Sequence, residues 1–470
     1  MTEYKLNNSI AKKLLSYQIG NAENIVRIIT ENKAVLDASD TGTGKTYSAI
    51  AACAQLKMRP FVVCPKSVMS AWRRVCEYFG VEKITIVNYE SIRNCKTYAD
   101  DTYNRVKSPY IKYVLQPKKN KDDSDKYKFV WNVPKDCIFI FDEAHKCSDI
   151  GTLNSLLLFG AKDSGNPIMI LSATIADHPE KFRLFFYILN FIEPATVEQQ
   201  KLEFHTYMRI VDRWIFRDDK PMNRIHNMLY PTRATRLRID TLGNLFPETQ
   251  IDCIPYTMGK SKESEIQKKY EEIAQELDAL KNKDNKERMN ALVRVLRAHQ
   301  KIELLKVPTF VELANDFMHS GYSVVIFVNF TKTLEMLAQM LATKCLIYGE
   351  QTAQEREKNI NDFQADKQRV IICNIKAGGV GVSLHDINGK YKRASLISPT
   401  WSAIDLTQSL GRIHRAGGKS KSLQRIIFTA NTVEEKIAEK LKIKLKDLNS
   451  INNGDLDLSH IIFQVKPVEM

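Results

Sequence analysis

The stretch that decides the fold of this chain is Asp40-Thr41-Gly42-Thr43-Gly44-Lys45-Thr46. It follows the apolar run 34–36 and precedes an alanine-rich helical pattern over residues 47–56. A strand, a glycine loop and a helix in this order form a cradle in which backbone N–H groups and the helix N-terminus hold phosphate oxygens. Lys45 is expected to reach the β- and γ-phosphates of a nucleotide, and the Thr46 hydroxyl to hold Mg²⁺. The full pattern G-x-x-x-x-G-K-S/T is not met, because Ser39 stands where the first glycine should be.

A second motif ends a short apolar run further along the chain. Residues 138–141 read Ile-Phe-Ile-Phe, as expected of a buried parallel strand, and Asp142-Glu143-Ala144-His145 follow directly. At the carboxyl end of such a strand, beside a phosphate loop, Asp142 can bind Mg²⁺ and Glu143 can polarise the attacking water. A solvated turn between a strand and a helix is the alternative. The presence of the lysine loop favours the nucleotide site.

Composition limits the classes of protein to which the chain can belong. Of its 470 residues 44% are hydrophobic, which is enough for two or three domain cores. The net charge of +14 favours a polyanionic partner, although an ordinary basic protein shows the same balance. The nine cysteines form no CxxC pair, so reduced thiols and no zinc site are expected.

The sequence gives no sign of export or of membrane insertion. Its first residues begin no signal peptide, and no apolar run approaches the ~20 residues that span a bilayer. We therefore expect a soluble intracellular protein, with nucleus, cytoplasm and viral particle left open.

Short apolar runs alternate with helical patterns in two blocks, which is typical of parallel sheets covered by helices. The runs of the first block are 34–36, 60–64, 84–87, 138–141 and 167–171, and those of the second are 323–328, 346–348, 370–373, 394–397 and 425–428. Between the blocks, residues 178–310 lack regular strand signals. Within this region, residues 263–280 are charged and helical in pattern, and residues 282–286 are polar enough for a loop tip.

A basic, tyrosine-rich insertion over residues 107–131 interrupts the first block. Residues 110–115 and 127–131 have β character, and the charged stretch 117–126 between them predicts a turn. We expect a projecting β-hairpin. Its lysine and aromatic side chains would suit nucleic acid, but a solvated hairpin without function is an equal interpretation.

The second block carries Gln408-Ser409-Leu410-Gly411-Arg412-Ile413-His414-Arg415, which has helical periodicity. Arg412 and Arg415 are three residues apart and are predicted to share one helix face. Arginines on a mobile lobe can enter a nucleotide site on a facing lobe and stabilise transition-state charge. A surface helix with ion pairs is the alternative.

Taken together, these segments resemble the motifs of the superfamily-two helicases in order and spacing. The matching segments are Gln18, 40–46, 142–145, Ser172-Ala173-Thr174, Ala377-Gly378-Gly379-Val380-Gly381 and 408–415. Within that superfamily the chain is similar to the Swi/Snf-type DNA translocases. The residues that carry this second resemblance are 62–67 with Trp72, 189–194 with Phe204, 245–249 with Gln267 and Tyr270, Trp401 and Asp405 before Gln408, and 431–437.

The resemblance runs from about residue 14 to 440 and has two departures. Residues 172–174 read Ser-Ala-Thr, where Swi/Snf members often have Gly-Thr, and Gly418 stands where Gln is frequent. The chain leaves almost no room for accessory domains. In this lack of accessory domains it resembles the helicase-like ATPases of large DNA viruses and phages.

The resemblance implies an α/β fold of two RecA-like parallel-sheet lobes with helical insertions between them. Residues 1–245 would form the ATP-binding first lobe, with the 107–131 hairpin insertion and a helical protrusion at about 180–235. Residues 246–470 would form the second lobe, with a helical protrusion at about 258–305 followed by the helicase C-terminal lobe.

The resemblance also implies roles for single residues. Gln18 would read the adenine edge, residues 40–46 would bind ATP, and Thr46 and Asp142 would hold Mg²⁺. Gln408, Arg412 and Arg415 would complete the catalytic site when the lobes close. Candidates for coupling or for nucleic-acid contact are His145, Ser172, Thr174, Gly378, Gly379, Gly381 and Trp401. A strand-end cap at residues 172–174 and an ordinary tight turn at residues 378–381 are the plainer interpretations.

The sequence therefore predicts a Mg²⁺-dependent, nucleic-acid-stimulated ATPase that translocates on DNA through backbone contacts, without sequence preference. Protein partners would direct it to transcription, replication or repair. An RNA helicase is the first alternative, because the DEAH and Ser-Ala-Thr motifs also occur there, although the long inter-lobe region argues against it. A nucleotide-binding scaffold of a viral transcription or repair complex is the second. The intact Lys45, Glu143 and Arg415 argue against such an inactive protein.

Overall fold

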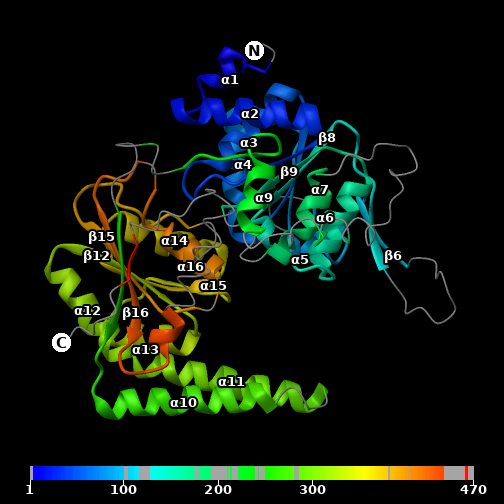
Figure 1. The fold of residues 1–470 in the computed structure, drawn as a ribbon. Coiled ribbons are helices and arrows are strands. Elements are labelled where there is room, and N and C mark those ends of the chain that lie inside the picture. Colours follow the sequence, from blue (N-terminus) through cyan, green and yellow to red (C-terminus); the bar gives the residue numbers. More distant parts are fainter. Residues whose placement is uncertain are drawn as a thin grey trace. The chain divides into compact units, whose positions relative to one another are not determined.

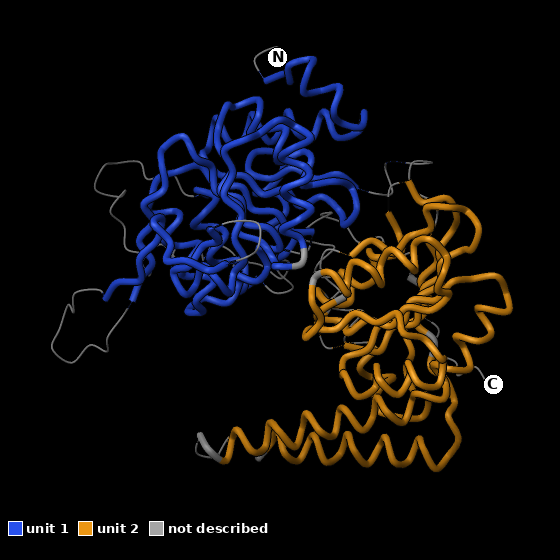
Figure 2. Tube along the Cα trace, turned by 180° about the vertical axis from the view of Figure 1, so that it is seen from behind, with its two compact units in different colours: residues 1–243, 447–456 blue, residues 244–446, 457–470 orange. Residues whose placement is uncertain are grey.

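The chain folds into two compact units that meet in sequence at Gly243 and Asn244 (Figure 2). The computed structural model describes residues 4–99, 104–115, 127–173, 175, 179–191, 209, 212–213, 221–238, 242, 249–279, 285–378, 382–400, 402–415, 417–438 and 461–463. Each unit contains one parallel sheet with helices packed on it, so the predicted pair of α/β units is confirmed.

The first unit contains a six-stranded parallel sheet in the order β10-β1-β9-β8-β2-β3. Its strands are β1 Ala34–Asp37, β2 Arg59–Cys64, β3 Thr85–Asn88, β8 Cys137–Asp142, β9 Ile168–Leu171 and β10 Ala234–Thr235. Both faces of the central strands are buried, which explains their unbroken apolar runs. In the register, Asp37 and Asp142 both lie opposite Leu171, so β1, β9 and β8 end side by side.

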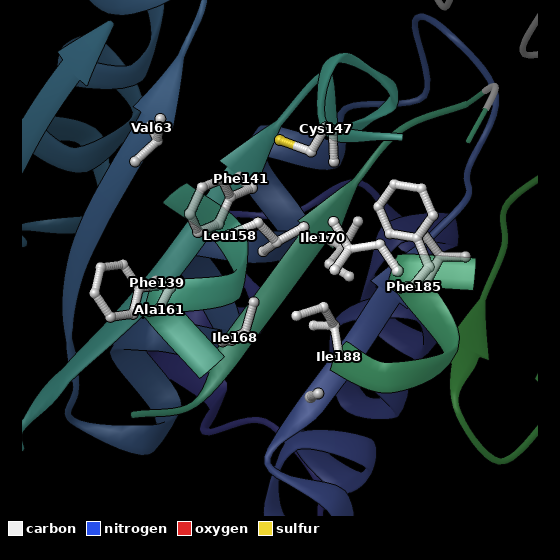
Figure 3. Close-up of a cluster of buried hydrophobic side chains, with 14 of the residues drawn as sticks. Val63, Phe139, Phe141, Cys147, Leu158, Ala161, Ile168, Ile170, Phe185 and Ile188 are labelled. Carbon is white, nitrogen blue, oxygen red and sulfur yellow. The ribbon is translucent and has the colours of Figure 1, made fainter. Parts of the chain in front are cut away.

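Helices cover both faces of this sheet (Figure 1). The helices are α1 Asn8–Ala11, α2 Ser16–Asn32, α3 Lys45–Leu56, α4 Met69–Phe79, α5 Tyr89–Ile92, α6 Leu153–Asp163, α7 Arg183–Ile188 and α9 Pro221–Leu229. Helices α2, α3 and α4 pack on one face, against side chains such as Val35, Val62 and Ile140. Figure 3 shows the opposite core, where Phe139 and Ile170 of the sheet meet Leu158 of α6 and Phe185 of α7.

Two antiparallel strand pairs extend the first unit. The predicted hairpin contains β6 Ile111–Leu115 and β7 Tyr127–Trp131, paired in register, and its predicted turn lies outside the described residues. A second pair, β4 Lys96–Tyr98 with β5 Arg105–Lys107, was not predicted. Its strands are three residues long and too short for a period-2 pattern to stand out.

The second unit contains a seven-stranded parallel sheet in the order β13-β14-β12-β15-β16-β11-β17. The strands are β11 Thr249–Tyr256, β12 Tyr322–Val328, β13 Leu346–Ile347, β14 Val370–Asn374, β15 Lys392–Ile397, β16 Ser422–Thr429 and β17 Ile461–Phe463. Its helices are α10 Lys260–Ala279, α11 Asn285–Leu305, α12 Val307–His319, α13 Thr331–Met340, α14 Ala353–Gln364, α15 Ile375–Gly378 and α16 Ala403–Leu410.

Strand β11 corrects the expectation that residues 178–310 lack strands. It pairs with β16 over all eight of its residues. Asp252 and Pro255 interrupt its apolar pattern, and both residue types are depleted in strands. The register with β16 places Asp252 opposite Arg425, which supplies a positive charge 4.0 Å from its carboxylate. Tertiary pairing thus overrides a weak local preference.

Helices α10 and α11 form a long pair that is fixed at its base by a buried ion pair. Lys306, just before α12, contacts Glu434, and both side chains are 2% exposed. The Tyr270 hydroxyl of α10 donates to Glu434 Oε1 at 2.9 Å, and the Thr429 backbone N–H donates to Oε2 at 2.7 Å. Because the carboxylate accepts these bonds together with the ammonium, its buried charge is satisfied.

Neither unit offers a helix suited to a bilayer: none of those in the described ranges is long and apolar enough to span one. All nine cysteines are free thiols.

Candidate nucleotide site

Three loops meet where β1, β9 and β8 end at the carboxyl edge of the first sheet. They are the glycine loop after β1, Ser172 after β9, and the Asp142–His145 segment after β8. Ligands of open parallel sheets bind at this edge. The sequence motifs, about 100 residues apart along the chain, are therefore brought to one place by strand order alone.

The glycine loop has the backbone conformation that a phosphate cradle requires. Gly42 and Gly44 have φ of 92° and 91°, in the left-handed region, and α3 begins at Lys45. A Cβ added at Gly44 would lie 2.1 Å from Gln18 Nε2. Gly44 is thus needed both for its backbone conformation and for the close approach of α2.

Gln18 is buried against this loop. Its Nε2 donates to Thr43 O at 2.9 Å, and its Oε1 accepts from the Leu15 backbone N–H at 3.0 Å. The same acceptor closes the capping box at the start of α2. The amide therefore ties the N-terminal helix to the phosphate loop. Recognition of an adenine edge by this residue stays a prediction.

Lys45 lies among carboxylates. Its Nζ donates to Ser39 O at 2.6 Å and to Asp40 O at 3.2 Å. Burial lowers the pKa of Lys45, while the charges of Asp37, Glu143, Asp142 and Asp40 oppose that shift. Four carboxylates around one ammonium leave a local excess of negative charge, which a triphosphate can approach only with an additional cation.

Hydrogen bonds hold both the carboxylate and the main-chain oxygen of Asp142. Trp72 Nε1 donates to its Oδ2 at 2.9 Å, the Glu143 backbone N–H donates to its Oδ1 at 2.9 Å, and the Tyr89 hydroxyl donates to its main-chain oxygen at 2.9 Å. Burial, followed by the charge of Glu143, raises the pKa of Asp142 to about 6. A divalent cation would satisfy this partly compensated carboxylate, and an oxygen set of Asp142 and Thr46 suits Mg²⁺.

Glu143 adopts φ of 52°, a left-handed conformation that is strained for a residue with a Cβ. His145 Nδ1 lies 3.4 Å from Glu143 Oε2 and 3.3 Å from Ser172 Oγ. The Ser172 backbone N–H donates to Asp37 O at 3.2 Å. His145 and Ser172 thus connect Glu143 to the end of β1, whereas Thr174 lies outside the described residues.

Sequence reasoning missed a buried polar network beneath the loop. Asp37 Oδ1 accepts from the Ser39 backbone N–H at 2.9 Å and Oδ2 accepts from Asn21 Nδ2 at 3.2 Å, while Asn21 Oδ1 accepts from Thr235 Oγ1 at 2.6 Å. Burial raises the pKa of Asp37, and the charge of Lys45 opposes this. The one available signal was an acidic residue that ends an otherwise apolar run.

The segment after β10 is bonded to the glycine loop by an ion pair and by hydrogen bonds. Arg236 Nη2 lies 2.6 Å from Asp40 Oδ1. The Leu237 backbone N–H donates to Ser39 Oγ at 2.8 Å, and the Asp40 backbone N–H donates to Leu237 O at 2.9 Å. We call residues 235–237 the strap. Almost 200 residues separate it from the loop, so no local pattern predicts the contact.

In the second unit, the predicted arginine helix ends before its arginines, which corrects the sequence-based expectation. Helix α16 stops at Leu410, and Gly411 caps it. Arg412 is 1% exposed, with Nε donating to Gln408 O at 2.8 Å and Nη1 to Val382 O at 3.3 Å. Arg415 is half-buried, and its Nη1 donates to Ser383 Oγ at 2.6 Å.

Four of the predicted coupling or contact residues lie outside the described residues, Thr174 being the first of them. Gly378 ends α15, but Gly379, Gly381 and Trp401 lie outside the described residues. Gln408 is buried in α16, where its main-chain oxygen accepts the bond from Arg412. The catalytic roles of Gln408, Arg412 and Arg415 stay predictions.

We predict that Gly44→Ala lowers the affinity for MgATP about tenfold or more, because the added Cβ strains the loop and displaces Gln18. Gly20→Ala is the matched control. Gly20 lies in α2, no atom lies within 4 Å of its added Cβ, and helix propensity favours alanine. Isothermal titration with a non-hydrolysable ATP analogue measures both variants. Equal affinities would refute the close contact.

We predict that Arg236→Ala raises KM for ATP about tenfold with a smaller change in kcat, because the strap no longer holds Asp40. Arg236→Lys should restore part of the affinity, since it keeps the charge. Steady-state ATPase assays on both variants give the two constants. A lower melting temperature with an unchanged KM would mean that Arg236 only stabilises the fold.

Comparisons with known proteins agree with this geometry. The family described as type III restriction enzyme, res subunit, matches residues 11–177, and the helicase conserved C-terminal domain matches residues 305–417. Among solved structures, a variant of Saccharomyces cerevisiae Dbp5 bound to RNA and ADP-BeF3 matches with a TM-score of 0.50 at 13% identity, covering 99% of this chain and 95% of that one. This likeness shows the fold, two RecA-like lobes.

Curated relatives extend over nearly the whole chain. A putative ATP-dependent RNA helicase of Acanthamoeba polyphaga mimivirus is 39% identical over 469 residues, which are 96% of this chain and 86% of the relative. The Mus musculus chromodomain-helicase-DNA-binding protein 1-like is 23% identical over 94% of this chain. The human SWI/SNF-related regulator of chromatin, subfamily A member 1, is 22% identical over 93% of it. The chain spans 50% and 43% of these two relatives' lengths.

Family matches to both lobes, a viral relative of similar length and chromatin-remodelling relatives accompany a lysine loop and an Asp-Glu pair at one sheet edge. The chain therefore belongs to the Swi/Snf-like superfamily-two helicases and is a nucleic-acid-dependent ATPase.

Proposed function

We propose that this chain is a Mg²⁺-dependent motor that translocates on duplex DNA while it hydrolyses ATP to ADP and phosphate. The observation that carries the proposal is the convergence of Lys45, which follows the loop after β1, with Asp142 and Glu143 at the end of β8, the two strands that flank β9. This is the set of groups that phosphoryl transfer to water requires: a cation for the phosphates, a metal ligand, and a carboxylate for the water.

In the proposed cycle, Lys45 exchanges its contacts to Ser39 O and Asp40 O for phosphate oxygens. Thr46 and Asp142 would hold Mg²⁺, which would supply positive charge to the phosphates. Glu143 then orients the attacking water. His145, 3.4 Å from the Glu143 carboxylate, keeps that group in position and links it to Ser172.

The second unit contributes arginine. Of the two candidates, Arg415 suits a catalytic role better, because it is half-buried whereas Arg412 is 1% exposed. The Arg415 guanidinium bonds to Ser383 Oγ and to Gly411 O. Arg412 is buried, and its guanidinium and main-chain oxygen bond to the 382–384 segment. We therefore propose that Arg412 shapes the loop and that Arg415 reaches the phosphates when ATP draws the lobes together.

Two observations favour duplex DNA. The relatives that follow the viral one are named for chromatin remodelling and DNA binding, and α10 with α11 forms a long helical pair between the two motif blocks. The net charge of +14 suits phosphate contacts that read no bases. The viral relative is named an RNA helicase, so an RNA-dependent helicase is the second candidate.

We predict that Glu143→Gln retains MgATP binding but loses at least about 100-fold in turnover, because the amide cannot accept the proton of the attacking water. Lys45→Ala should weaken binding as well, since it removes a phosphate contact. Titration with ATP beside a turnover assay separates the two effects. Normal turnover of the Gln variant would show that another group serves the water.

We predict that Arg415→Ala lowers maximal turnover by about 10³-fold, as expected of an arginine finger, with nucleic-acid affinity nearly unchanged. Arg415→Lys keeps the charge but not the planar fork, and should recover little turnover. The comparison needs kcat at saturating nucleic acid and the dissociation constant on one preparation. A large loss of affinity with normal kcat would assign Arg415 to the nucleic acid.

Turnover with no nucleic acid, duplex DNA, single-stranded DNA and RNA, side by side, tests the substrate. Duplex DNA should stimulate most, with binding that weakens steeply as salt rises. Translocation should displace the third strand of a triplex and unwind a forked duplex poorly. Stimulation by RNA alone would favour the RNA helicase, and efficient fork unwinding without triplex displacement would favour a conventional helicase.

A further inference from the structure

The β6–β7 hairpin is rigidly anchored in the core of the first unit. Ile111 and Trp131 at its base are buried, and Trp131 Nε1 donates to Leu157 O at 3.0 Å. A Cβ added at Gly160 of α6 would lie 2.4 Å from Phe129 O, so α6 approaches the hairpin at the distance only glycine permits. The Trp131 ring packs on Phe139 of β8, with centroids 4.9 Å apart.

The outer half of the hairpin projects away from this core (Figure 1). Its sequence is rich in aromatic residues. Tyr113 and Tyr127 are 42% and 43% exposed, and their rings stack with centroids 5.0 Å apart and 17° between planes. Leu115 beside them is 51% exposed. We call these three residues the tyrosine ledge. Tyr113 also packs on the buried Phe129, so the ledge continues the apolar face that enters the core.

The charges on the strands of the two antiparallel pairs are of one sign, whereas the sequence between β6 and β7 contains four lysines together with Asp122, Asp123 and Asp125. Strands β4 to β7 contain the exposed Lys96, Arg105, Lys107, Lys112 and Lys128 and no acidic residue. The acidic group that Lys128 faces, Asp163, lies on α6. The hairpin thus has stacked rings on one face and lysines on the other. These two features match the two parts of an unpaired nucleotide, a base that stacks and a phosphate that needs positive charge. An acidic peptide would use the charges but would not need a stacked ring pair.

We propose that the tyrosine ledge binds unpaired nucleotides, with bases stacking on Tyr113 and Tyr127 of a hairpin whose other face carries Lys112 and Lys128. The proposal rests on the nucleic-acid-dependent motor proposed above, but not on which nucleic acid stimulates it. Bases inside a duplex already stack on each other, so the ledge selects single-stranded segments. The preferred substrate is then a duplex with a single-stranded flank, held by the motor on one side and by the hairpin on the other.

The double variant Tyr113→Ala/Tyr127→Ala tests this proposal in the full chain. Its affinity for duplex with a single-stranded flank, and for oligo(dT) and oligo(U), should fall about tenfold or more, since stacking of each base contributes that much. Affinity for blunt duplex and basal ATPase should not change. The dT and U arms show whether the ledge prefers DNA or RNA. A 2-aminopurine placed in the flank should be quenched by the native chain and not by this variant.

Two controls separate stacking from stability of the hairpin. Tyr113→Phe/Tyr127→Phe keeps both rings and should retain affinity and quenching. Val130→Ala removes an exposed side chain, 42% exposed, from the opposite face of the same hairpin and should have no effect. If the alanine pair binds flanked duplex as the native chain does, the ledge is not a nucleotide site and serves a protein or the hairpin itself. If duplex DNA does not stimulate turnover by the native chain, the proposed duplex motor is wrong. The proposal that the ledge binds unpaired nucleotides is not affected by that result.

Discussion

The buried ammonium of Lys45, bonded to two main-chain oxygens and acted on by the charges of four carboxylates, is the constraint on which the first unit depends. Four acidic groups act on it, and burial opposes its charge. A buried cation requires compensation, and compensation here comes from β1, from the loop itself and from β8. The parallel order β1-β9-β8 is what brings these carboxylates together. The sheet is therefore built around one charge balance, and a nucleotide with its metal ion changes that balance in a single step.

The strap bonds the phosphate loop to the part of the chain that precedes the second unit. Residues 235–237 bond to Ser39 and Asp40 of the loop, and seven residues later the chain passes from the first unit to the second. These bonds come from residues almost 200 positions away, so they fix the phosphate loop to the end of the first unit and not to its neighbours in sequence.

The sequence alone predicted those parts of the structure whose residues are close together in the chain. The lysine loop, the Asp142–His145 segment and the apolar runs predict both parallel sheets, because each strand and its loop are encoded within about ten residues. It was insufficient where a role depends on long-range packing. Asp37, Asn21, Thr235 and Arg236 have no motif, since their partners lie on other elements. Strand β11 lacks a strand pattern and exists because β16 pairs with it along its whole length.

The arginines show why periodicity is a weak guide near a helix end. Gly411 has little helix propensity and follows the last residue of α16, so the chain leaves the helix before Arg412. The two side chains then differ in burial. Arg412 is buried and bonds to Gln408 O and Val382 O, while Arg415 is half-buried and bonds to Gly411 O and Ser383 Oγ. A common helix face would give both arginines the same task. The observed turn gives the two arginines different surroundings. Because a buried guanidinium bonded to carbonyls, as in Arg412, is costly to release, we propose the catalytic role for Arg415.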